Sequence, residues 1–267
     1  MKFDYRETTN DLAIRIDIHN QYGGRNIDAW MLDLLALQPG IDILDIGCGA
    51  GKQCFSYYDH LNGKANISGG DVNQELLDQA RQEAVKRAAP ISFFDLDFNK
   101  HFDLPDDAYD LVSCCFAIYY ADNVPFTIGE MKRVLKPGGR LFTTGPMPEN
   151  KKLFYDIIRE ATDNRPIPPM PGSSRYSSEF LDVIKKEFPK VEVHIFENPL
   201  VFDAAEPFVS YVRASLSEDR KLWSTFFQSK DEFQQIMEKI EQAATRRIAQ
   251  DGKLVMTKVV GGFLGTK

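Results

Sequence analysis

The sequence predicts an α/β protein whose core is a mostly parallel, seven-stranded sheet with helices on both faces. Between residues 41 and 145, short apolar runs alternate with stretches in which apolar residues recur at helical spacing. Turn residues separate these segments, above all the glycines within 47–51 and the Pro-Gly-Gly of 137–139. Strands that alternate with helices in this way form parallel sheets, because each helix returns the chain across a face of the sheet.

The individual elements follow from this alternation. Seven segments have the composition of strands, at 41–46, 65–70, 91–96, 111–117, 140–144, 191–195 and 254–264. The helices expected in the first half of the sheet span 52–61, 73–87 and 125–135, and Asn73 is a suitable cap for the second of them. A further helix is expected at 179–188. In such a sheet, ligands bind at the edge formed by the carboxyl ends of the parallel strands.

The ends of the chain and the region before the last strand have a different character. The first 40 residues are predicted to be helical, although Leu12, Ile14, Ile16 and Ile18 alternate as in a strand. A proline-rich segment at 165–174 predicts an irregular loop, and a helical insertion is expected at 206–250. We therefore expect an N-terminal helical segment (1–40), a core (41–200), a helical cap or lid (201–252) and a final core strand (253–267).

Composition limits the possible partners. The 267 residues are 43% hydrophobic and 27% charged and carry a formal net charge of −7, which fits one large domain or a domain with an inserted cap. An acidic chain without a basic run is not expected to bind nucleic acid. The longest apolar run, 111–120, is much shorter than the roughly 20 residues that span a bilayer, so no membrane association is expected.

Cysteine usage predicts a reducing compartment. The four cysteines, Cys48, Cys54, Cys114 and Cys115, include no CxxC pair, and no set of cysteines and histidines has the spacing of metal ligands. We therefore expect a cytoplasmic protein without a bound metal.

The most informative segment is the glycine loop after the first strand. Residues 43–52 read ILDIGCGAGK, so buried apolar residues run directly into closely spaced glycines. The spacing is GxGxG, because Lys52 stands where the dinucleotide fingerprint GxGxxG would have its last glycine. Asp45 precedes the first glycine by two positions, and Asp71 ends the second strand, where a carboxylate can accept hydrogen bonds from a ribose diol.

This combination resembles the class I S-adenosylmethionine-dependent methyltransferases, particularly the group that acts on small molecules. The resemblance is close over residues 41–145 and looser over the rest of the chain. Further landmarks are Leu104-Pro105, the segment YDLV at 109–112 and the segment MKRVLKPGG at 131–139. The resemblance implies a Rossmann-like, doubly wound fold, S-adenosylmethionine as the cofactor and a small-molecule methyl acceptor, either a metabolite or a natural product.

The same resemblance assigns residues to the cofactor. The family's glycine loop touches the methionine moiety and is matched here by Asp45, Gly47, Cys48, Gly49 and Gly51. Asp71 matches the acid on the ribose hydroxyls, and Val72 matches the apolar residue beside the adenine. Asp97 and Phe98 match the pair that reads the adenine amine and covers the ring. The expected cofactor set is completed by Tyr22, Gln53 and Cys115.

Candidates for a catalytic base are few. A hydroxyl or carbon nucleophile would need a positioned base, whereas an amine or thiolate needs little more than deprotonation. The family's segment before the glycine loop often folds over the methionine end of the cofactor, where Arg15, His19 or Tyr22 could meet the carboxylate or the substrate. An exposed helix face is the alternative for each. Tyr119 and Tyr120 follow the fourth strand, where the family lines the methyl-transfer cleft, so at least one is expected to face it.

The cap is expected to choose the methyl acceptor. Its aromatic residues mostly build its own core, and any that line the cleft would favour a partly apolar or aromatic molecule; they are Phe208, Tyr211, Trp223, Phe226 and Phe227. The cap could also serve as the interface of a homodimer. Two alternative functions remain open, a nicotinamide-dependent oxidoreductase and a methyltransferase-like protein that binds the cofactor without catalysis. The incomplete dinucleotide fingerprint weakens the first of them.

Overall fold

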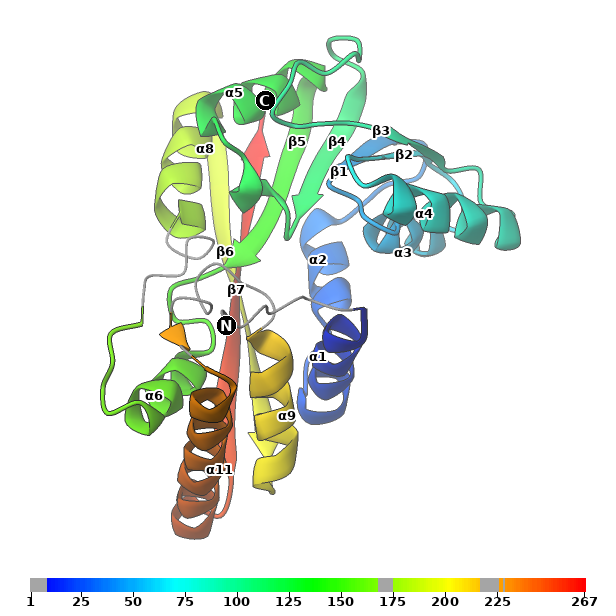
Figure 1. Cartoon of the computed structure of the whole chain (residues 1–267). Coiled ribbons are helices and arrows are strands. Elements are labelled where there is room, and N and C mark those ends of the chain that lie inside the picture. Colours follow the sequence, from blue (N-terminus) through cyan, green and yellow to red (C-terminus); the bar gives the residue numbers. More distant parts are fainter. Residues whose placement is uncertain (1–8, 168–174, 217–225, 228) are drawn as a thin grey trace. The chain divides into compact units, whose positions relative to one another are not determined.

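The structure is a computed structural model, and it describes residues 9–167, 175–216, 226–227 and 229–267 (Figure 1). Most of the proline-rich segment and the cap aromatic Trp223 lie outside these residues. Among the described residues, no helix combines the length and the apolar character needed to cross a bilayer.

A seven-stranded sheet in the order β3-β2-β1-β4-β5-β7-β6 confirms the expected fold class. Neighbouring strands from β3 to β5 are parallel, and β7 is antiparallel to β5, which makes the sheet mostly parallel. Because β1 to β5 run the same way, the segments that follow them meet at one edge of the sheet. The strands are β1 (Asp42–Ile46), β2 (Asn66–Asp71), β3 (Ser92–Asp95), β4 (Tyr109–Cys115), β5 (Leu135–Pro146), β6 (Lys190–Phe202) and β7 (Leu254–Thr266).

The helices include all of those expected from the sequence. Asn73 accepts a hydrogen bond from the backbone N–H of Leu76, so the predicted cap is confirmed. Ser229 caps α11 in the same way, by accepting from the N–H of Glu232. The helices are α1 (Thr9–Tyr22), α2 (Ile27–Leu35), α3 (Lys52–His60), α4 (Gln74–Lys86), the 3₁₀ turn η1 (Ile118–Tyr120), α5 (Val124–Val134), α6 (Lys152–Ala161), the π-helical turn η2 (Tyr176–Phe180), α8 (Leu181–Glu187), α9 (Ala205–Ser215) and α11 (Lys230–Asp251).

Three elements differ from the sequence prediction. The strand expected at 140–144 begins at Leu135, because Leu135 already pairs with Tyr109 of β4. The register shifts between this pair and Leu111, so the Pro-Gly-Gly segment lies within the strand. The helix α6 was not predicted, since its N-cap residue Lys151 offers no side-chain cap. The alternation of apolar residues at 12–18 suggests a strand, but these residues lie in the helix α1.

The chain divides into two compact units. The core unit contains the described residues within 27–148, 170–196 and 260–267, and the cap unit contains those within 1–26, 149–169 and 197–259. Strands β6 and β7 contribute residues to both units.

The core unit has a hydrophobic cluster on each face of its sheet. Alternate residues of one strand enter different clusters, as Ile43 and Leu44 of β1 show. The cluster with Ile43 includes buried residues of α2, α3 and α4, and the cluster with Leu44 includes those of α5 and α8. Figure 1 shows α3 and α4 beside β1 to β3. The sheet is therefore doubly wound, as expected.

The cap unit has a hydrophobic core of its own. Its buried residues come from α1, α6, α9 and α11 and from the cap-unit parts of β6 and β7. Four of the expected cap aromatics belong to this core, namely Phe208, Tyr211, Phe226 and Phe227. These four aromatic residues are buried, as their helical spacing predicts.

Candidate functional site

The glycine loop forms a tight bend where β1 ends. The backbone N–H groups of Gly47 and Cys48 both donate to the carbonyl of Gly70 in β2, at 2.7 and 3.1 Å. Gly51 closes the bend by donating to the carbonyl of Cys48 at 2.9 Å and also precedes the first turn of α3. The loop is thus held by backbone hydrogen bonds. The helix that follows it presents the backbone N–H groups of its first turn, which have no acceptor within the helix.

The first and the central glycine of this loop serve different purposes. Both have left-handed backbones, with φ of +69° at Gly47 and +54° at Gly49. A Cβ atom added to Gly47 would lie 2.5 Å from the Cβ of Ala117, so the protein's own packing requires a glycine there. A Cβ atom added to Gly49 would meet only Leu76, at an ordinary 3.8 Å. Gly49 therefore faces space that the described side chains leave open.

Asp71 ties the end of β2 to the glycine loop. One carboxylate oxygen accepts a hydrogen bond from the N–H of Gly49 at 2.8 Å, and the other accepts one from the N–H of Asn73 at 2.9 Å. Each oxygen of a carboxylate can accept a second hydrogen bond, so the fixed carboxylate can still receive two donors from a ligand. Val72, the next residue, is 59% exposed, which is unusual for an apolar side chain at the edge of a sheet.

The residues after β3 provide a second acid and an apolar ring. Asp97 accepts hydrogen bonds from the N–H of Asn99 and from Lys100, and these bonds hold the pKa of its carboxyl below the usual value. The ring of Phe98 lies near the glycine loop, since a Cβ atom on Gly47 would be 3.9 Å from it. Asp95 pairs with Asp71 in the strand register, but its side chain is exposed and accepts a hydrogen bond from Gln74.

Asp45 is buried beneath the glycine loop, with an exposed fraction of 2%. Its carboxyl accepts a hydrogen bond from the hydroxyl of Ser113 in β4 at 2.6 Å and a weaker one from the thiol of Cys54 in α3. Burial raises the pKa of this carboxyl to about 7, and the hydrogen bonds from Ser113 and Cys54 limit the rise. Asp45 therefore cross-links β1 and β4 close to the loop.

Three other residues of the predicted cofactor set lie in the same part of the core unit. Gln53 is buried in the first turn of α3, and its amide nitrogen makes no hydrogen bond to the described residues. Cys48 is buried within the loop. Cys115 ends β4, and burial raises the pKa of its thiol. An unsatisfied buried amide is uncommon in folded proteins, so Gln53 is a candidate for contact with a ligand.

The turn after β4 presents aromatic side chains at this edge of the sheet. Phe116 is 41% exposed and has a left-handed backbone with φ of +58°, which is strained for a phenylalanine. The rings of Tyr119 and Tyr120 lie 4.8 Å apart, and Tyr120 is 65% exposed. Arg175 holds this turn, because its guanidinium donates to the carbonyls of Tyr119 and Ala121 at 3.3 and 3.0 Å.

His19 and Tyr22 belong to the cap unit, as the last turn of α1. The ring of His19 lies 5.6 Å from that of Tyr211, and the ring of Tyr22 lies 5.0 Å from that of Phe202. Their assignment to catalysis and to the cofactor stays a prediction.

Residues missed by the sequence analysis connect distant segments. Ser113 and Arg175 carry no local signal, since each becomes informative only through a partner more than 50 residues away. The fixed turn after β4 and the buried carboxyl of Asp45 therefore depend on tertiary contacts, which local sequence patterns do not reveal.

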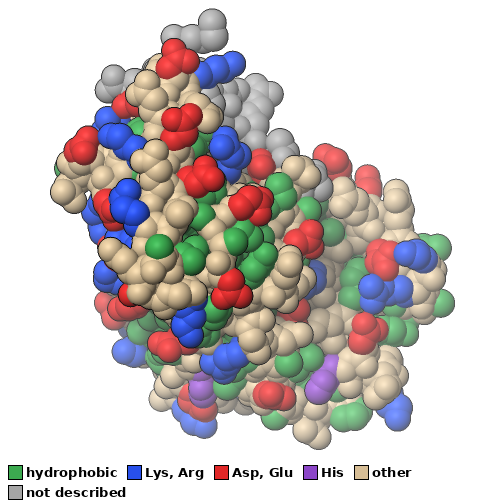
Figure 2. Space-filling view, turned by 90° about the horizontal axis from the view of Figure 1, so that it is seen from below, with side chains coloured by type: hydrophobic (Ala, Val, Ile, Leu, Met, Phe, Trp, Pro, Cys, Tyr) green, Lys and Arg blue, Asp and Glu red, His purple; other side chains and the backbone are tan. Residues whose placement is uncertain are grey.

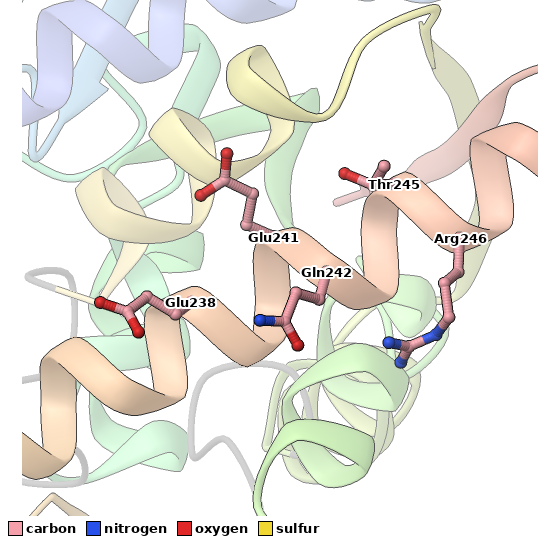
Figure 3. A pocket seen from close by; sticks show the side chains of 5 residues that line it. All are labelled: Glu238, Glu241, Gln242, Thr245 and Arg246. Atoms are coloured by element: carbon pink, nitrogen blue, oxygen red, sulfur yellow. The ribbon is translucent and has the colours of Figure 1, made fainter.

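Two surface features are separate from these residues. A hollow of about 600 Å³ runs along α11, lined by five side chains of that single helix (Figure 3): Glu238, Glu241, Gln242, Thr245 and Arg246. None of the predicted site residues lines it. On the face seen in Figure 2, acidic and basic side chains are interspersed over the described residues. No group of three or more ligating side chains within the described ranges could hold a metal ion.

Comparison with known proteins finds a methyltransferase domain in part of the chain. Residues 43–139 match the family model described as a methyltransferase domain. Nocamycin O-methyltransferase of Saccharothrix syringae is 27% identical over 118 residues, which cover 44% of this chain and 42% of that protein. The ubiquinone/menaquinone biosynthesis C-methyltransferase of Paracoccus denitrificans is 32% identical over 153 residues, covering 54% of this chain and 60% of that protein.

A solved structure shares the fold. The YcgJ protein of Bacillus subtilis superposes with a TM-score of 0.59 at 18% identity, covering 90% of this chain and 97% of that one. The matches span only 33% to 44% of the length of three curated relatives. Strand order and glycine loop together define a doubly wound α/β protein with a cofactor-type loop. The match over residues 43–139 and the order of the sheet together support a class I S-adenosylmethionine-dependent methyltransferase.

Proposed function

We propose that this protein transfers a methyl group from S-adenosylmethionine to a small-molecule acceptor. The observation that carries the proposal is the pairing of Asp71 with Gly49: a carboxylate fixed by two backbone N–H groups stands beside a loop whose central glycine faces open space. This arrangement suits a ligand that combines a ribose with an extended amino-acid chain. The match of residues 43–139 to a methyltransferase domain supports the same conclusion.

The residues of the core unit fit the cofactor in three places. Asp71 would hold the ribose hydroxyls, since each of its oxygens can accept one more hydrogen bond. Val72 and the ring of Phe98 would flank the adenine, and Asp97 would accept from its amine. The remaining core-unit residues of the proposed set would serve the methionine part, namely Asp45, Gly47, Cys48, Gly49, Gly51, Gln53 and Cys115. The proposed set also includes Tyr22, which belongs to the cap unit.

When bound, the cofactor supplies a methyl group that its sulfonium already makes electrophilic. The chain's own residues then have to bind the methyl acceptor, exclude water and hold the nucleophile in line, at about 3–3.5 Å from the reacting carbon. We assign the positioning to the turn after β4, where Arg175 fixes the backbone that carries Tyr119 and Tyr120. Tyr119, Tyr120 and His19 are the candidates for accepting a proton from a hydroxyl or carbon nucleophile.

The acceptor is proposed to be a metabolite or natural product with an apolar or aromatic part. The exposed rings of Phe116 and Tyr120 at the carboxyl end of β4 support this choice, because small-molecule sites are mostly lined by such side chains. The relatives named above methylate oxygen in one case and carbon in the other, so they leave the nucleophile open. We also propose a cytoplasmic location, which the four free cysteines support. A homodimer stays a prediction.

Calorimetric titration with S-adenosylhomocysteine and with NAD tests the proposal. We expect the wild-type chain to bind S-adenosylhomocysteine and not NAD, and Asp71→Asn to lose at least about tenfold in affinity, because it removes one charged hydrogen-bond partner. Asp95→Asn is the matched control, since Asp95 is the register neighbour of Asp71 but points to Gln74. Tight binding of NAD, or equal affinities of the two variants, would contradict the assignment.

A further inference from the structure

Strand β6 forms one edge of the sheet, and its first half is open. It is the last strand in the order of the sheet, so only β7 pairs with it as a strand. Its residues 190–196 belong to the core unit. Within the described parts of the chain, no segment pairs with the outer side of these residues. We call residues 190–196 the open edge.

Other parts of the sheet's edges are protected. Strand β3, at the opposite end of the sheet, has only four residues, and the guanidinium of Arg81 donates to the carbonyl of Phe93 at 3.3 and 3.1 Å. In the cap unit, Gly23 pairs with Leu200 of β6. Proteins usually shield the edges of a sheet by such means, because an unpaired edge is a template for another chain.

The two faces of the open edge differ in character. Val193 and Ile195 point to one face and are 43% and 45% exposed. Lys190, Glu192 and His194 point to the other face, because side chains alternate along a strand. On that face Glu192 lies 2.8 Å from Lys190 and 3.4 Å from His194. An apolar row and a row of acidic and basic groups therefore lie back to back on one strand.

We propose that the open edge pairs with the same edge of a second copy of the chain, antiparallel and with the two-fold axis beside Val193. An axis perpendicular to the sheet keeps each side chain on its own face, so it has to pass beside one residue of the strand. With the axis at Val193, the two copies of Val193 lie opposite each other. Val191 then lies opposite the second copy's Ile195, and Glu192 lies opposite the second copy's His194.

Charge selects this register among the neighbouring ones. An axis beside Glu192 would place two carboxylates opposite each other, and an axis beside His194 would place two imidazoles opposite each other. Like charges in these positions are destabilising, whereas opposite charges are stabilising. With the axis at Val193, each Glu192 instead faces a basic group, so the open edge is complementary to itself.

The same register covers the exposed apolar row. Val193 and Ile195 would be buried against their counterparts, next to Val191, which already packs against the hydrophobic cluster of α5 and α8. Pairs of β-branched side chains on neighbouring strands stabilise a sheet. The interface would lie in the core unit and not in the cap. This proposal does not rest on the proposed function.

Sedimentation equilibrium of the full chain tests whether the dimer exists. We expect the wild type to have twice the mass of one chain, which is 30.3 kDa. A single chain over the whole range of soluble concentrations would overturn the proposal.

Two lysine variants locate the interface. Val193→Lys places two ammonium groups opposite each other at the axis, so this variant should be monomeric. Val201→Lys is the matched control, since Val201 is a 36% exposed valine of the same strand outside the open edge, and it should stay dimeric. A dimeric Val193→Lys, or a monomeric Val201→Lys, would place the interface elsewhere and overturn the proposal.

Two variants of His194 test the register. In His194→Glu a carboxylate faces the second copy's Glu192, whereas in His194→Lys the opposite charges are kept. Because the two-fold axis repeats this contact, the dimer of His194→Glu should dissociate at least about tenfold more readily than that of His194→Lys. Equal dissociation constants of the two variants would overturn the register.

A disulfide can trap the dimer at its axis. Opposite residues of an antiparallel pair have Cα atoms about 4.5–5.5 Å apart, which is within the roughly 4.4–6.8 Å that a disulfide spans. Mild oxidation of Val193→Cys should therefore give a covalent dimer on a non-reducing gel. Val201→Cys, eight positions from the axis, should stay a single chain on that gel. Equal yields of covalent dimer from the two variants would overturn the proposal.

Discussion

The glycine loop of the core unit and the surroundings of Tyr211 in the cap unit are built by different means. The loop is held by backbone hydrogen bonds and by a glycine that the packing requires, with Asp45 and Asp71 as its anchors. Tyr211 is instead surrounded by side chains of three separate segments, namely Lys151, Lys258 and His19. The comparison shows that the loop depends on backbone geometry, whereas the cap unit depends on the packing of side chains.

This difference can be tested within the loop itself. Substitutions at positions that the packing requires should lower the free energy of unfolding, and a substitution at the glycine that faces open space should affect mainly binding.

The largest expected effect concerns the buried carboxyl of Asp45. Its pKa is about 7 in the folded chain, compared with 3.8 for an ordinary aspartate, so the folded state binds more protons than the unfolded state between these pH values. The free energy of unfolding of the wild type should therefore fall by up to about 4 kcal/mol as the pH rises from 4 to 7. It should level off above pH 7. Asp45→Asn should remove this pH dependence and be the more stable protein at pH 8.

Urea unfolding at several pH values between 4 and 8 measures this difference. Asp95→Asn serves as the control, because it removes an exposed carboxyl from the same edge of the sheet. A constant difference in stability between wild type and Asp45→Asn across this range would mean that the carboxyl titrates normally, and that Asp45 is not the buried anchor described above.

The first glycine of the loop should show the next largest effect. Gly47→Ala adds a Cβ atom 2.5 Å from that of Ala117 to a left-handed backbone, so overpacking and strain together should cost about 3 kcal/mol. Gly40→Ala has the same kind of backbone but nothing within 4 Å, and it should lose only about 1 kcal/mol. Chemical denaturation of both variants gives the comparison. Similar losses would show that the close approach to Ala117 does not limit the loop.

The two regions also differ in how far the sequence predicts them. The strands, the glycine loop and the position of Asp71 follow from local patterns, because periodicity and turn residues act over a few neighbours. The partner of Asp45 does not follow, since Ser113 lies 68 positions away and its hydroxyl is one of many on buried strands. The start of α6 was missed because the left-handed Lys151 provides no capping side chain.

The surroundings of Tyr211 do not follow from the sequence for the same physical reason. Lys258 is a polar residue in an apolar strand, and nothing in its neighbourhood indicates that the segment before α6 is fastened beside it. The ring contact of His19 with Tyr211 also arises from tertiary packing, and the proposed catalytic role of His19 stays a prediction.

The smallest expected change in stability, at Gly49, sharpens the comparison most. Gly49 is the loop position at which an added Cβ atom meets no close neighbour, so Gly49→Ala should cost only about 1 kcal/mol of backbone strain. The same Cβ atom would enter the space that we assign to the cofactor, and affinity for S-adenosylhomocysteine should fall at least about tenfold. Gly138→Ala carries similar strain at the other end of the sheet and should leave the affinity unchanged. If Gly49→Ala binds S-adenosylhomocysteine with normal affinity, the space beside Gly49 is not part of the cofactor site. The ligand would then not need close contact with the backbone of this loop.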